Sequence, residues 1–486
     1  MSSKLAEVSI PGTFQHEYSE YQARRHELWE RNSVILDRSW GGYYRTRLKQ
    51  VYRFSIPEGS SVLEIGCGRG DLLAALKPSL GVGVDFSESM VSLARQRHPN
   101  MEFIVADAHE LNLVGRTFDY IVISDVVNDL WDVQAVIDRI KICCMPQTRL
   151  IFNYFSHLWG GVLRLAQKLG VATPSLPQNW LTQKDMINLL ELSGFQALRV
   201  WGEVLVPLKI PFISDFANRY LSRISPFRFF SFANFLLARP SPKPRKERCT
   251  VSVIVAARNE EGHITDLMAR IPEMGGGTEI VFIEGHSSDD TYGAIEREIA
   301  KNPHRRCKLL KQPGKGKGDA VRFGCAATSG DILMVLDADI TVPPEDLPRF
   351  YNIIASGNAE FVNGVRLVYP MQDNAMRFAN LVGNKFFSWA FSWLLGQPIR
   401  DTLCGTKAIW ADDYQRLADN RAYFGNFDPF GDFDLLFGVA KLNLKIMEVP
   451  IRYRARRYGE TNIQRWRHGW LLLRMAVFAA RRIKFV

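Results

Sequence analysis

Short apolar runs that end on acidic or polar residues recur along the chain, and they constrain its fold more than any other feature. Segments of helical pattern separate them. In the N-terminal half these runs lie within residues 61–72, 81–85, 101–107 and 118–125, and in the C-terminal half they lie within 250–261, 279–284 and 331–339. Buried strands that alternate with helices form doubly wound parallel sheets, with a site where the carboxyl ends of the strands meet. We predict the α/β class, with two doubly wound domains.

A stretch of different composition separates the two halves. Residues 239–248 are rich in Pro, Lys and Arg and lack apolar periodicity, which is typical of an extended linker. The full length of 486 residues is enough for two domains with their own cores. We therefore place domains at residues 1–238 and 249–486. Residues 14–55 form a helical, aromatic lead-in, which is either a lid over a site or a packing helix.

The charge and the cysteine content restrict which partners the protein can bind and in which cellular compartment we expect it. A net charge of +10 suits a nucleic acid, an anionic membrane or nucleotide diphosphates. No RNA-binding or zinc-finger spacing is present, so we expect no nucleic acid. The seven cysteines are scattered without a C-x-x-C pair, and we see no signal peptide and no long uncharged apolar run. We expect a cytoplasmic protein, with peripheral contact to the cytosolic membrane face as a possibility.

The first apolar run leads into a glycine turn, Val-Leu-Glu-Ile-Gly-Cys-Gly-Arg-Gly at 62–70. Glycines let the chain turn sharply and let a ligand approach the backbone. The next strand ends on Asp85, at the spacing where a ribose diol binds, the third ends on Asp107, and the fourth ends at Asp125. A dinucleotide dehydrogenase shares the glycine turn. The G-x-G-x-G spacing and the acid after the third strand argue against that class.

These four motifs, in this order, resemble a class I S-adenosylmethionine-dependent methyltransferase over roughly residues 55–205. The resemblance implies that Asp85 binds the ribose hydroxyls, that Asp107 binds the adenine amine and that Asp125 lines the methyl-transfer pocket. The implied cofactor-binding residues are Glu64, Gly66, Gly68, Gly70, Asp85, Asp107 and Asp125. We recognise no catalytic base in the acceptor pocket from the sequence.

Two segments interrupt the later part of this domain. A long insertion at 154–180 precedes a helix predicted at 182–193, which Thr182 and Asp185 would start, and a strand at 197–206. We interpret the insertion as a candidate acceptor lid. Residues 215–237 are rich in Phe and Arg, which fits either packing between domains or an interfacial segment.

The strand at 331–339 carries the main candidate site of the second domain. Asp337 and Asp339 are separated by one residue, so their side chains point to the same side beyond the sheet. Their oxygens suit Mg²⁺ or Mn²⁺ carrying a diphosphate. A basic glycine loop at 311–318, which includes Lys317, opens a helix just before this strand and suits oxyanions.

Residues 250–465 resemble a family 2 glycosyltransferase of the GT-A fold, and within it the dolichyl- or polyprenyl-phosphate sugar synthases. The glycine loop and the motif at 401–407 carry that subgroup resemblance. It implies a nucleotide-diphosphate sugar as donor and a polyprenyl-phosphate or glycan as acceptor. Asp337 and Asp339 would bind the metal, and Glu284 stands where the family usually has Asp. The implied donor-binding residues are Glu260, Glu284, Asp289, Lys317 and Asp337.

The segment Gly431-Asp-Phe-Asp434 matches the family's E-D-x-D pattern, with Gly431 in place of Glu. We assign Asp432 and Asp434 as the catalytic residues, with Asp432 as the base that deprotonates an acceptor hydroxyl. If the acceptor is a phosphate, no base is required and Asp432 orients it. Alternatively, Asp432 caps the helix that follows.

Two aromatic segments, 376–395 and 470–486, fit either amphipathic helices on an anionic bilayer or core packing. Together the motifs predict a bifunctional enzyme that transfers a sugar with inversion and methylates within the same glycan or glycolipid pathway. One alternative is a glycosyltransferase with a non-catalytic S-adenosylmethionine-binding module. Another is a nucleic-acid methyltransferase with a scaffold tail, which the absence of a base-flipping signature disfavours.

Overall fold

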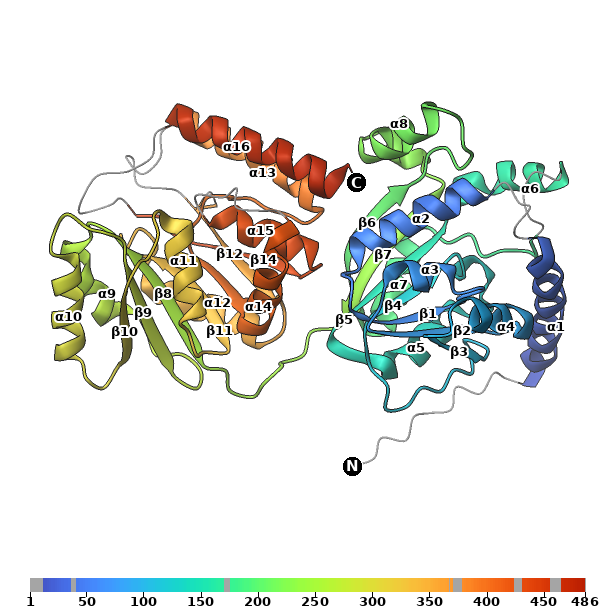
Figure 1. Ribbon diagram of the computed structural model, residues 1–486, viewed down its shortest axis with the longest axis horizontal. Helices are drawn as coiled ribbons and strands as arrows, with labels where there is room; N and C mark the ends of the chain where they lie inside the picture. The colour runs from blue at the N-terminus through green and yellow to red at the C-terminus, as the bar shows by residue number, and fades with distance from the viewer. Residues whose placement is uncertain are drawn as a thin grey trace. The chain divides into compact units, whose positions relative to one another are not determined.

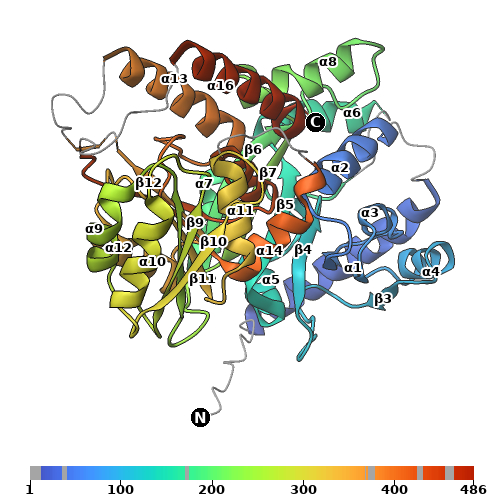
Figure 2. The ribbon, with the colours of Figure 1, turned by 60° about the vertical axis from the view of Figure 1, so that its left-hand side comes forward.

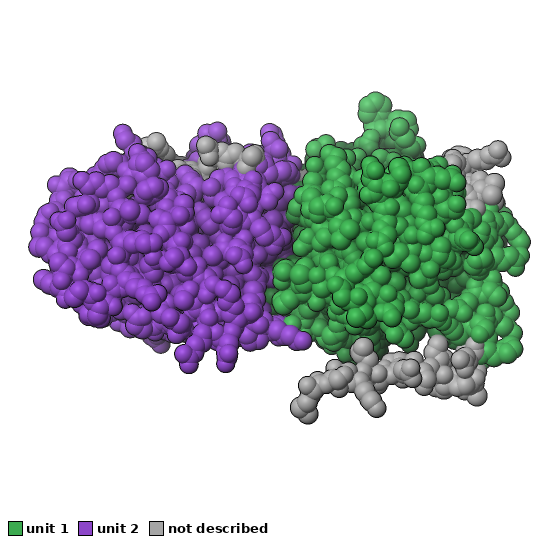
Figure 3. All heavy atoms as spheres, turned by 60° about the horizontal axis from the view of Figure 1, so that its bottom comes forward, with its two compact units in different colours: residues 1–241, 485–486 green, residues 242–484 purple. Residues whose placement is uncertain are grey.

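Two seven-stranded sheets form the centre of the molecule in the computed structural model, which describes residues 12–35, 41–169, 175–366, 368–369, 378–423, 431–454 and 465–485. The chain divides into unit 1, residues 1–241 with 485–486, and unit 2, residues 242–484 (Figure 3). Each unit contains one sheet. The predicted fold class, two α/β domains, is confirmed.

The sheet of unit 1 has the strand order β3-β2-β1-β4-β5-β7-β6 (Figure 1). The first five strands of this order, β3, β2, β1, β4 and β5, are parallel, and β7 is antiparallel to both β5 and β6. The carboxyl ends of the parallel strands therefore share one edge. The strands are β1 (Ser61–Ile65), β2 (Leu80–Asp85), β3 (Glu102–Val105), β4 (Phe118–Ser124), β5 (Cys144–Phe155), β6 (Phe195–Glu203) and β7 (Ala233–Pro240).

Helices cover both faces of this sheet, which explains why its strands are almost continuously apolar. Helices α2 (Gly42–Ser55), α3 (Asp71–Leu76) and α4 (Glu88–Arg97) pack on one face, and α5 (Val133–Ile140) and α7 (Gln183–Leu192) pack on the other (Figure 2). Thr182 and Asp185 form a reciprocal capping box at the start of α7, which confirms the predicted helix start. The remaining helices are α1 (Gly12–Ile35), α6 (Gly160–Lys168) and α8 (Ile213–Arg219).

The region predicted as a linker is structured at both ends. Its first two residues belong to β7, a strand that sequence analysis did not predict. Farther along, Arg245 forms an ion pair with Asp413 at 2.7 Å, and Lys246 forms one with Asp331. The extended part of the chain between the units is therefore shorter than the predicted ten residues, because strand pairing and ion pairs hold its ends.

The sheet of unit 2 has the order β10-β9-β8-β11-β13-β12-β14 (Figure 1). The first four strands of this order are parallel, and β13 is antiparallel to β11 and β12. The strands are β8 (Val251–Ala257), β9 (Thr278–Glu284), β10 (Arg306–Lys311), β11 (Ile332–Asp337), β12 (Phe361–Val365), β13 (Lys407–Trp410) and β14 (Ile446–Pro450).

The main core of unit 2 lies between this sheet and the helices α9 (Ile264–Arg270), α10 (Thr291–Lys301) and α12 (Leu347–Ala355) (Figure 2). Helix α11 (Lys317–Ala326) packs so closely that a Cβ on Gly324 would lie 2.5 Å from the Ile254 side chain. The other helices are α13 (Phe378–Leu395), α14 (Ala411–Asp419), α15 (Asp432–Lys441) and α16 (Arg465–Ala479).

Both aromatic segments of unit 2 are helical, as α13 and α16. Phe391 of α13 is buried and stacks on Phe437 of α15, whereas Trp389 is exposed. Each helix thus has a packed side and an exposed apolar side. Among the described residues, no helix combines the length and the apolar character needed to cross a membrane.

Candidate functional site

The glycine turn between β1 and α3 has the backbone that only glycine adopts readily. Gly66, Gly68 and Gly70 have φ values of 73°, 50° and 71°. A Cβ on Gly66 would lie 2.1 Å from the Val126 side chain, so a larger residue does not fit. Backbone conformation and packing therefore both require glycine in this turn, and its contact with S-adenosylmethionine stays a prediction.

Asp85, at the carboxyl end of β2, is fixed by that same turn. Its Oδ2 accepts a hydrogen bond from the Gly68 amide at 2.8 Å, and its Oδ1 accepts one from the Ser87 amide at 3.0 Å. The side chain is 9% exposed, and burial raises its pKa. The carboxylate is thus held beside the glycine turn with fixed orientation, as binding a ribose diol would require.

Asp107 lies beside a cavity of about 390 Å³ that helix α1 closes on one side. It accepts hydrogen bonds from the Gln22 side chain at 3.1 Å and from both the amide and the ring of His109, at 2.8 and 2.7 Å. Burial opposes ionisation, but the His109 hydrogen bonds outweigh it and lower the pKa of Asp107 to about 2. Side chains of α1 line the cavity, including Tyr18, Gln22 and Arg25. The lead-in helix is therefore a wall of the candidate adenine pocket.

Glu64 is buried in β1, and burial raises its pKa to about 8. Its Oε2 atom has no hydrogen-bond partner among the described residues. A buried carboxyl oxygen without a partner is costly and suits a ligand donor such as the methionine ammonium group. The glycine turn, the fixed Asp85 and this unpaired atom together fit S-adenosylmethionine.

Asp125 follows β4 and belongs to a polar cluster that the sequence did not reveal. Its Oδ1 accepts hydrogen bonds from the Tyr44 hydroxyl at 2.7 Å and from the Asn153 amide, whose Oδ1 accepts from Tyr52 at 2.7 Å. Burial raises the pKa of Asp125 to about 7, although Tyr44 and Asn153 lower it in part. A carboxyl group with a pKa near neutrality suits proton transfer. Asp125 is thus a candidate base, which the sequence alone did not indicate.

In unit 2, Asp337 ends β11 and pairs with Lys317, the first residue of α11. The two charged atoms, Asp337 Oδ1 and Lys317 Nζ, lie 2.5 Å apart. Burial alone would raise the pKa of Asp337, but Lys317 lowers it below its ordinary value. Gly405 allows this approach, since a Cβ there would lie 2.1 Å from Asp337 Oδ2 and 2.4 Å from Lys317 Nζ. The acid and the cation predicted for a diphosphate site therefore meet.

Asp339 is oriented by Thr341, whose amide and hydroxyl donate to Oδ1 at 3.1 and 2.7 Å. In the described part of the chain no group of three or more His, Cys, Asp or Glu could form an all-protein metal site. Mg²⁺ commonly binds one or two carboxylates and completes its shell with water and substrate phosphates. Asp337 and Asp339 fit a metal that shares its ligands with a diphosphate.

Asp432 forms a buried ion pair with Lys407 of β13, with 2.9 Å between Oδ1 and Nζ. Helix α15 begins at Asp432, its N-cap is Gly431 with φ 77°, and no side chain caps it. The Asp432 carboxylate is thus paired with a lysine and does not cap the helix. Asp434 instead accepts from Arg421 at 2.7 Å. The two predicted catalytic acids therefore pair with different cations, and Asp432 pairs with the motif at 401–407.

Three acidic residues expected to bind the donor lie at the ends of β8 and β9: Glu260 follows β8, Glu284 ends β9 and Asp289 follows it. Glu260 is buried and its Oε2 accepts from the His263 ring at 2.8 Å, and Glu284 accepts from the Ser287 amide at 2.6 Å. Asp289 accepts from the Thr291 amide at 3.2 Å and from its hydroxyl at 2.5 Å. These carboxylates line the end of two adjacent parallel strands, and each has local partners in the apoprotein.

The motif at 401–407 contains more of the site than the sequence indicated. Asp401 is fully buried and forms a bidentate ion pair with Arg366, at 2.7 and 2.9 Å. Gly405 makes room for the Lys317–Asp337 pair, and Lys407 pairs with Asp432. The sequence shows this motif as Asp, Gly and Lys at a fixed spacing. The partner of each of these residues becomes visible only in the folded structure.

Comparison with known proteins agrees with this description. Residues 252–433 match the model of glycosyl transferase family 2, and residues 62–147 match that of a methyltransferase domain. A dolichyl-phosphate hexose transferase of Haloferax volcanii is 30% identical over 45% of this chain and 89% of its own length. A demethylmenaquinone methyltransferase of Bacillus licheniformis is 28% identical over 30% of this chain and 62% of its own length.

A crystal structure of glucosyl-3-phosphoglycerate synthase from Mycobacterium tuberculosis is 22% identical, with a TM-score of 0.37, over 49% of this chain and 80% of that chain. Across four glycosyltransferase relatives from Haloferax volcanii and Pyrococcus furiosus, this chain spans 54% to 89% of their length. The family matches define a transferase with two domains. The C-terminal half of the chain belongs to glycosyl transferase family 2, and the N-terminal half contains a methyltransferase domain.

Proposed function

We propose that the chain is a bifunctional enzyme. Its C-terminal domain transfers a sugar, with inversion, from a nucleotide-diphosphate sugar to a polyprenyl-phosphate or glycan acceptor. Its N-terminal domain transfers a methyl group from S-adenosylmethionine to an acceptor in the same glycan or glycolipid pathway. The observation that carries the proposal is the cluster of Lys317–Asp337 and Lys407–Asp432 ion pairs beside Gly405.

In the glycosyltransferase site, Lys317 offsets the negative charge of the donor diphosphate. A Mg²⁺ or Mn²⁺ ion bound by Asp337 and Asp339 would supply further positive charge toward the leaving group. An acceptor phosphate oxygen forms the new bond to the anomeric carbon while the bond to the diphosphate breaks, and this step moves no proton. With a hydroxyl acceptor, Asp432 accepts the released proton. Lys407 keeps Asp432 oriented in either case.

Chelation tests the metal requirement. We expect EDTA to abolish transfer and Mg²⁺ or Mn²⁺ to restore it, and we expect Asp339→Asn to be inactive even with added metal. Asp346→Asn is the matched control, because Asp346 is another acidic residue that follows β11 in the chain and it forms an ion pair with Arg349. Full transfer in EDTA would refute a metal-dependent donor site.

In the methyltransferase site, Asp125 is the group that accepts a proton from the methyl acceptor. The acceptor oxygen forms a bond to the methyl carbon while the bond from carbon to sulphur breaks, and Asp125 takes the hydroxyl proton. Its raised pKa of about 7 and its hydrogen bond from Tyr44 support this role. A non-catalytic module would bind S-adenosylmethionine without turnover on any acceptor, which single-turnover assays with the radiolabelled cofactor distinguish.

Helices α13 and α16 provide the surface by which the glycosyltransferase domain contacts an anionic membrane. Trp389 of α13 and Trp470 of α16 are 68% and 64% exposed, and Arg481 and Arg482 follow α16. Exposed aromatic side chains next to basic ones suit the membrane interface. Truncation at His468 should reduce transfer to a lipid acceptor more than hydrolysis of the donor. Equal loss of both reactions would instead indicate a packing role.

A further inference from the structure

A second surface, in unit 1, is unusually apolar. It is formed by the insertion at 204–232, which contains α8 and the short helices η5 (Leu221–Arg223) and η6 (Phe227–Phe230). We call its exposed side the aromatic face. Phe212 is 90% exposed and Phe229 is 65% exposed, and no residue of η6 is buried. The aromatic face consists of Phe212, Ile213, Phe216, Phe227, Phe229 and Phe230.

The segment 204–232 buries small and polar residues of its helix α8 and exposes apolar ones. The buried residues of α8 are Ser214, Ala217 and Asn218, while Ile213 and Phe216 point outward. A helix that packs on a protein core normally buries its apolar side and exposes its polar side. The outward apolar residues therefore do not stabilise the fold of unit 1. Large apolar side chains that are exposed together on one short segment indicate an interaction site.

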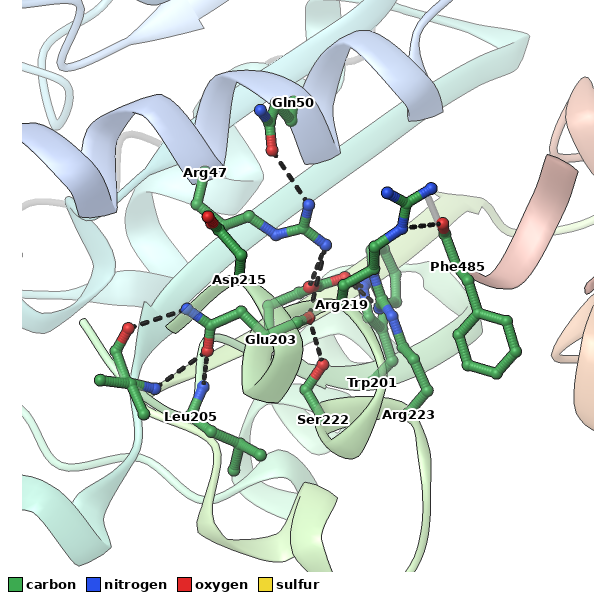
Figure 4. A network of polar contacts seen from close by, with 12 residues as sticks. Arg47, Gln50, Trp201, Glu203, Leu205, Asp215, Arg219, Ser222, Arg223 and Phe485 are labelled. Carbon is green, nitrogen blue, oxygen red and sulfur yellow. Dashed lines mark hydrogen bonds and ion pairs between the residues drawn. The ribbon is translucent and has the colours of Figure 1, made fainter. Parts of the chain in front are cut away.

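A buried polar network holds the insertion in place (Figure 4). The Asn218 side chain accepts from the amides of Leu205 and Val206, at 2.7 and 2.9 Å. Glu203, at the end of β6, forms ion pairs with Arg223 of η5 and with Arg47 of α2, the latter at 3.7 Å. The aromatic face is thus presented on a fixed support that connects to the sheet and to α2.

Charge identifies what the aromatic face contacts. Residues 204–232 contain four basic residues and one acidic residue, Asp215, and Lys209 and Arg228 are exposed. The neighbouring insertion also contributes: Val162 and Leu165 of α6 are 55% and 59% exposed. Residues 157–169 include Arg164 and Lys168 but no acid. Exposed apolar side chains accompanied by the exposed Lys209 and Arg228 suit an anionic bilayer, whereas a second copy of this chain would bring like charges together.

The aromatic face is connected to the candidate methyl-acceptor pocket. Trp159 Nε1 donates to the Phe230 carbonyl at 3.0 Å, and the rings of Trp159 and Phe232 lie 5.3 Å apart. Phe232 in turn lies 5.3 Å from the ring of Tyr44, which donates to Asp125. We propose that the aromatic face docks the methyltransferase domain on an anionic membrane surface. If the proposed function holds, this places the acceptor pocket next to lipid, which suits a lipid-linked methyl acceptor.

Vesicle flotation of the full chain tests this proposal without any substrate, so its outcome is independent of either enzymatic activity. Vesicles of phosphatidylcholine with phosphatidylglycerol are compared with phosphatidylcholine alone. Because α13 and α16 are themselves proposed to contact an anionic membrane, the parent protein in this assay is the full chain with Trp389→Ser/Trp470→Ser, which removes the exposed aromatic side chains of that other surface. We expect this parent to float with the anionic vesicles, and we expect the further change Phe212→Ser/Phe229→Ser/Phe230→Ser to lower partitioning at least tenfold. Lys209→Gln/Arg228→Gln should lower it roughly thirtyfold on anionic vesicles alone, at about 1 kcal/mol for each charge.

The matched control is Val114→Ser/Leu192→Ser, which removes apolar side chains that are 74% and 63% exposed elsewhere in unit 1. This control should float like the parent protein, and circular dichroism should show that all variants are folded. The proposal is overturned if the folded triple variant partitions like the parent, or if the parent does not float. It is also overturned if light scattering shows a dimer that the triple variant loses while vesicle binding stays unchanged.

Discussion

Gly405→Ala is the smallest change that should disable the glycosyltransferase site. A Cβ at this position would lie 2.1 Å from Asp337 Oδ2, whereas ordinary van der Waals contacts begin at 3.4 Å. The carboxylate must therefore move by about 1.3 Å (3.4 minus 2.1), or the loop must move by the same amount. The same Cβ would lie 2.4 Å from Lys317 Nζ, so both members of the ion pair are displaced.

A misplacement of about 1 Å at a reacting site costs roughly 100-fold in rate, which corresponds to about 2.7 kcal/mol of transition-state stabilisation. We expect kcat/KM for the nucleotide sugar to fall by that factor in Gly405→Ala. Gly383→Ala is the control, because a Cβ at Gly383 of α13 meets nothing within 4 Å. Steady-state transfer assays and melting curves separate lost activity from lost folding. A folded Gly405→Ala variant with unchanged kcat/KM would refute the placement of the donor site.

Three further predictions concern buried charges. Lys407→Met should lower the free energy of unfolding of the glycosyltransferase domain by about 3–5 kcal/mol, because it leaves Asp432 buried without its partner. Denaturant unfolding measures this change. The double variant Lys407→Met/Asp432→Asn should lose less stability than Lys407→Met alone. Methyl transfer should fall tenfold per pH unit below about 7, where Asp125 is protonated, and reach a plateau above it; an unchanged profile in Asp125→Asn would contradict its role. Folding raises the pKa of Glu64 from 4.5 to about 8, so its carboxyl group favours the folded state below pH 4.5 and loses that contribution as the pH rises through 8. The melting temperature should therefore decline as the pH rises from 4.5 to 8, and Glu64→Gln should make that decline less steep.

Strands and their terminal acids were predictable because they depend on local pattern. An apolar run followed by Asp85 or Asp337 shows both the buried strand and the edge at which the acid lies. The capping box of Thr182 and Asp185 is likewise local. Such features need only the period of the side chains and the neighbours along the chain.

Partnerships between distant residues were not predictable in this way. Asp125 depends on Tyr44, which lies 81 positions earlier in the chain, and its raised pKa follows from burial that only the assembled domain produces. Strand β7 was hidden because its end coincides with the Pro-rich stretch. The contacts of Lys407 with Asp432 follow from strand order, which no local pattern specifies.

The central claim, two transferase sites with separate residues, is tested most directly by a crossover experiment with Asp85→Ala and Asp337→Asn. Titration calorimetry measures S-adenosylmethionine binding, and a coupled assay measures sugar transfer. Asp85→Ala should weaken cofactor binding roughly 100-fold, since two charge-assisted hydrogen bonds to the ribose are lost, and should leave sugar transfer unchanged. Asp337→Asn should abolish sugar transfer and leave S-adenosylmethionine binding unchanged. If either substitution abolished both properties in a folded protein, the two sites would not be separate.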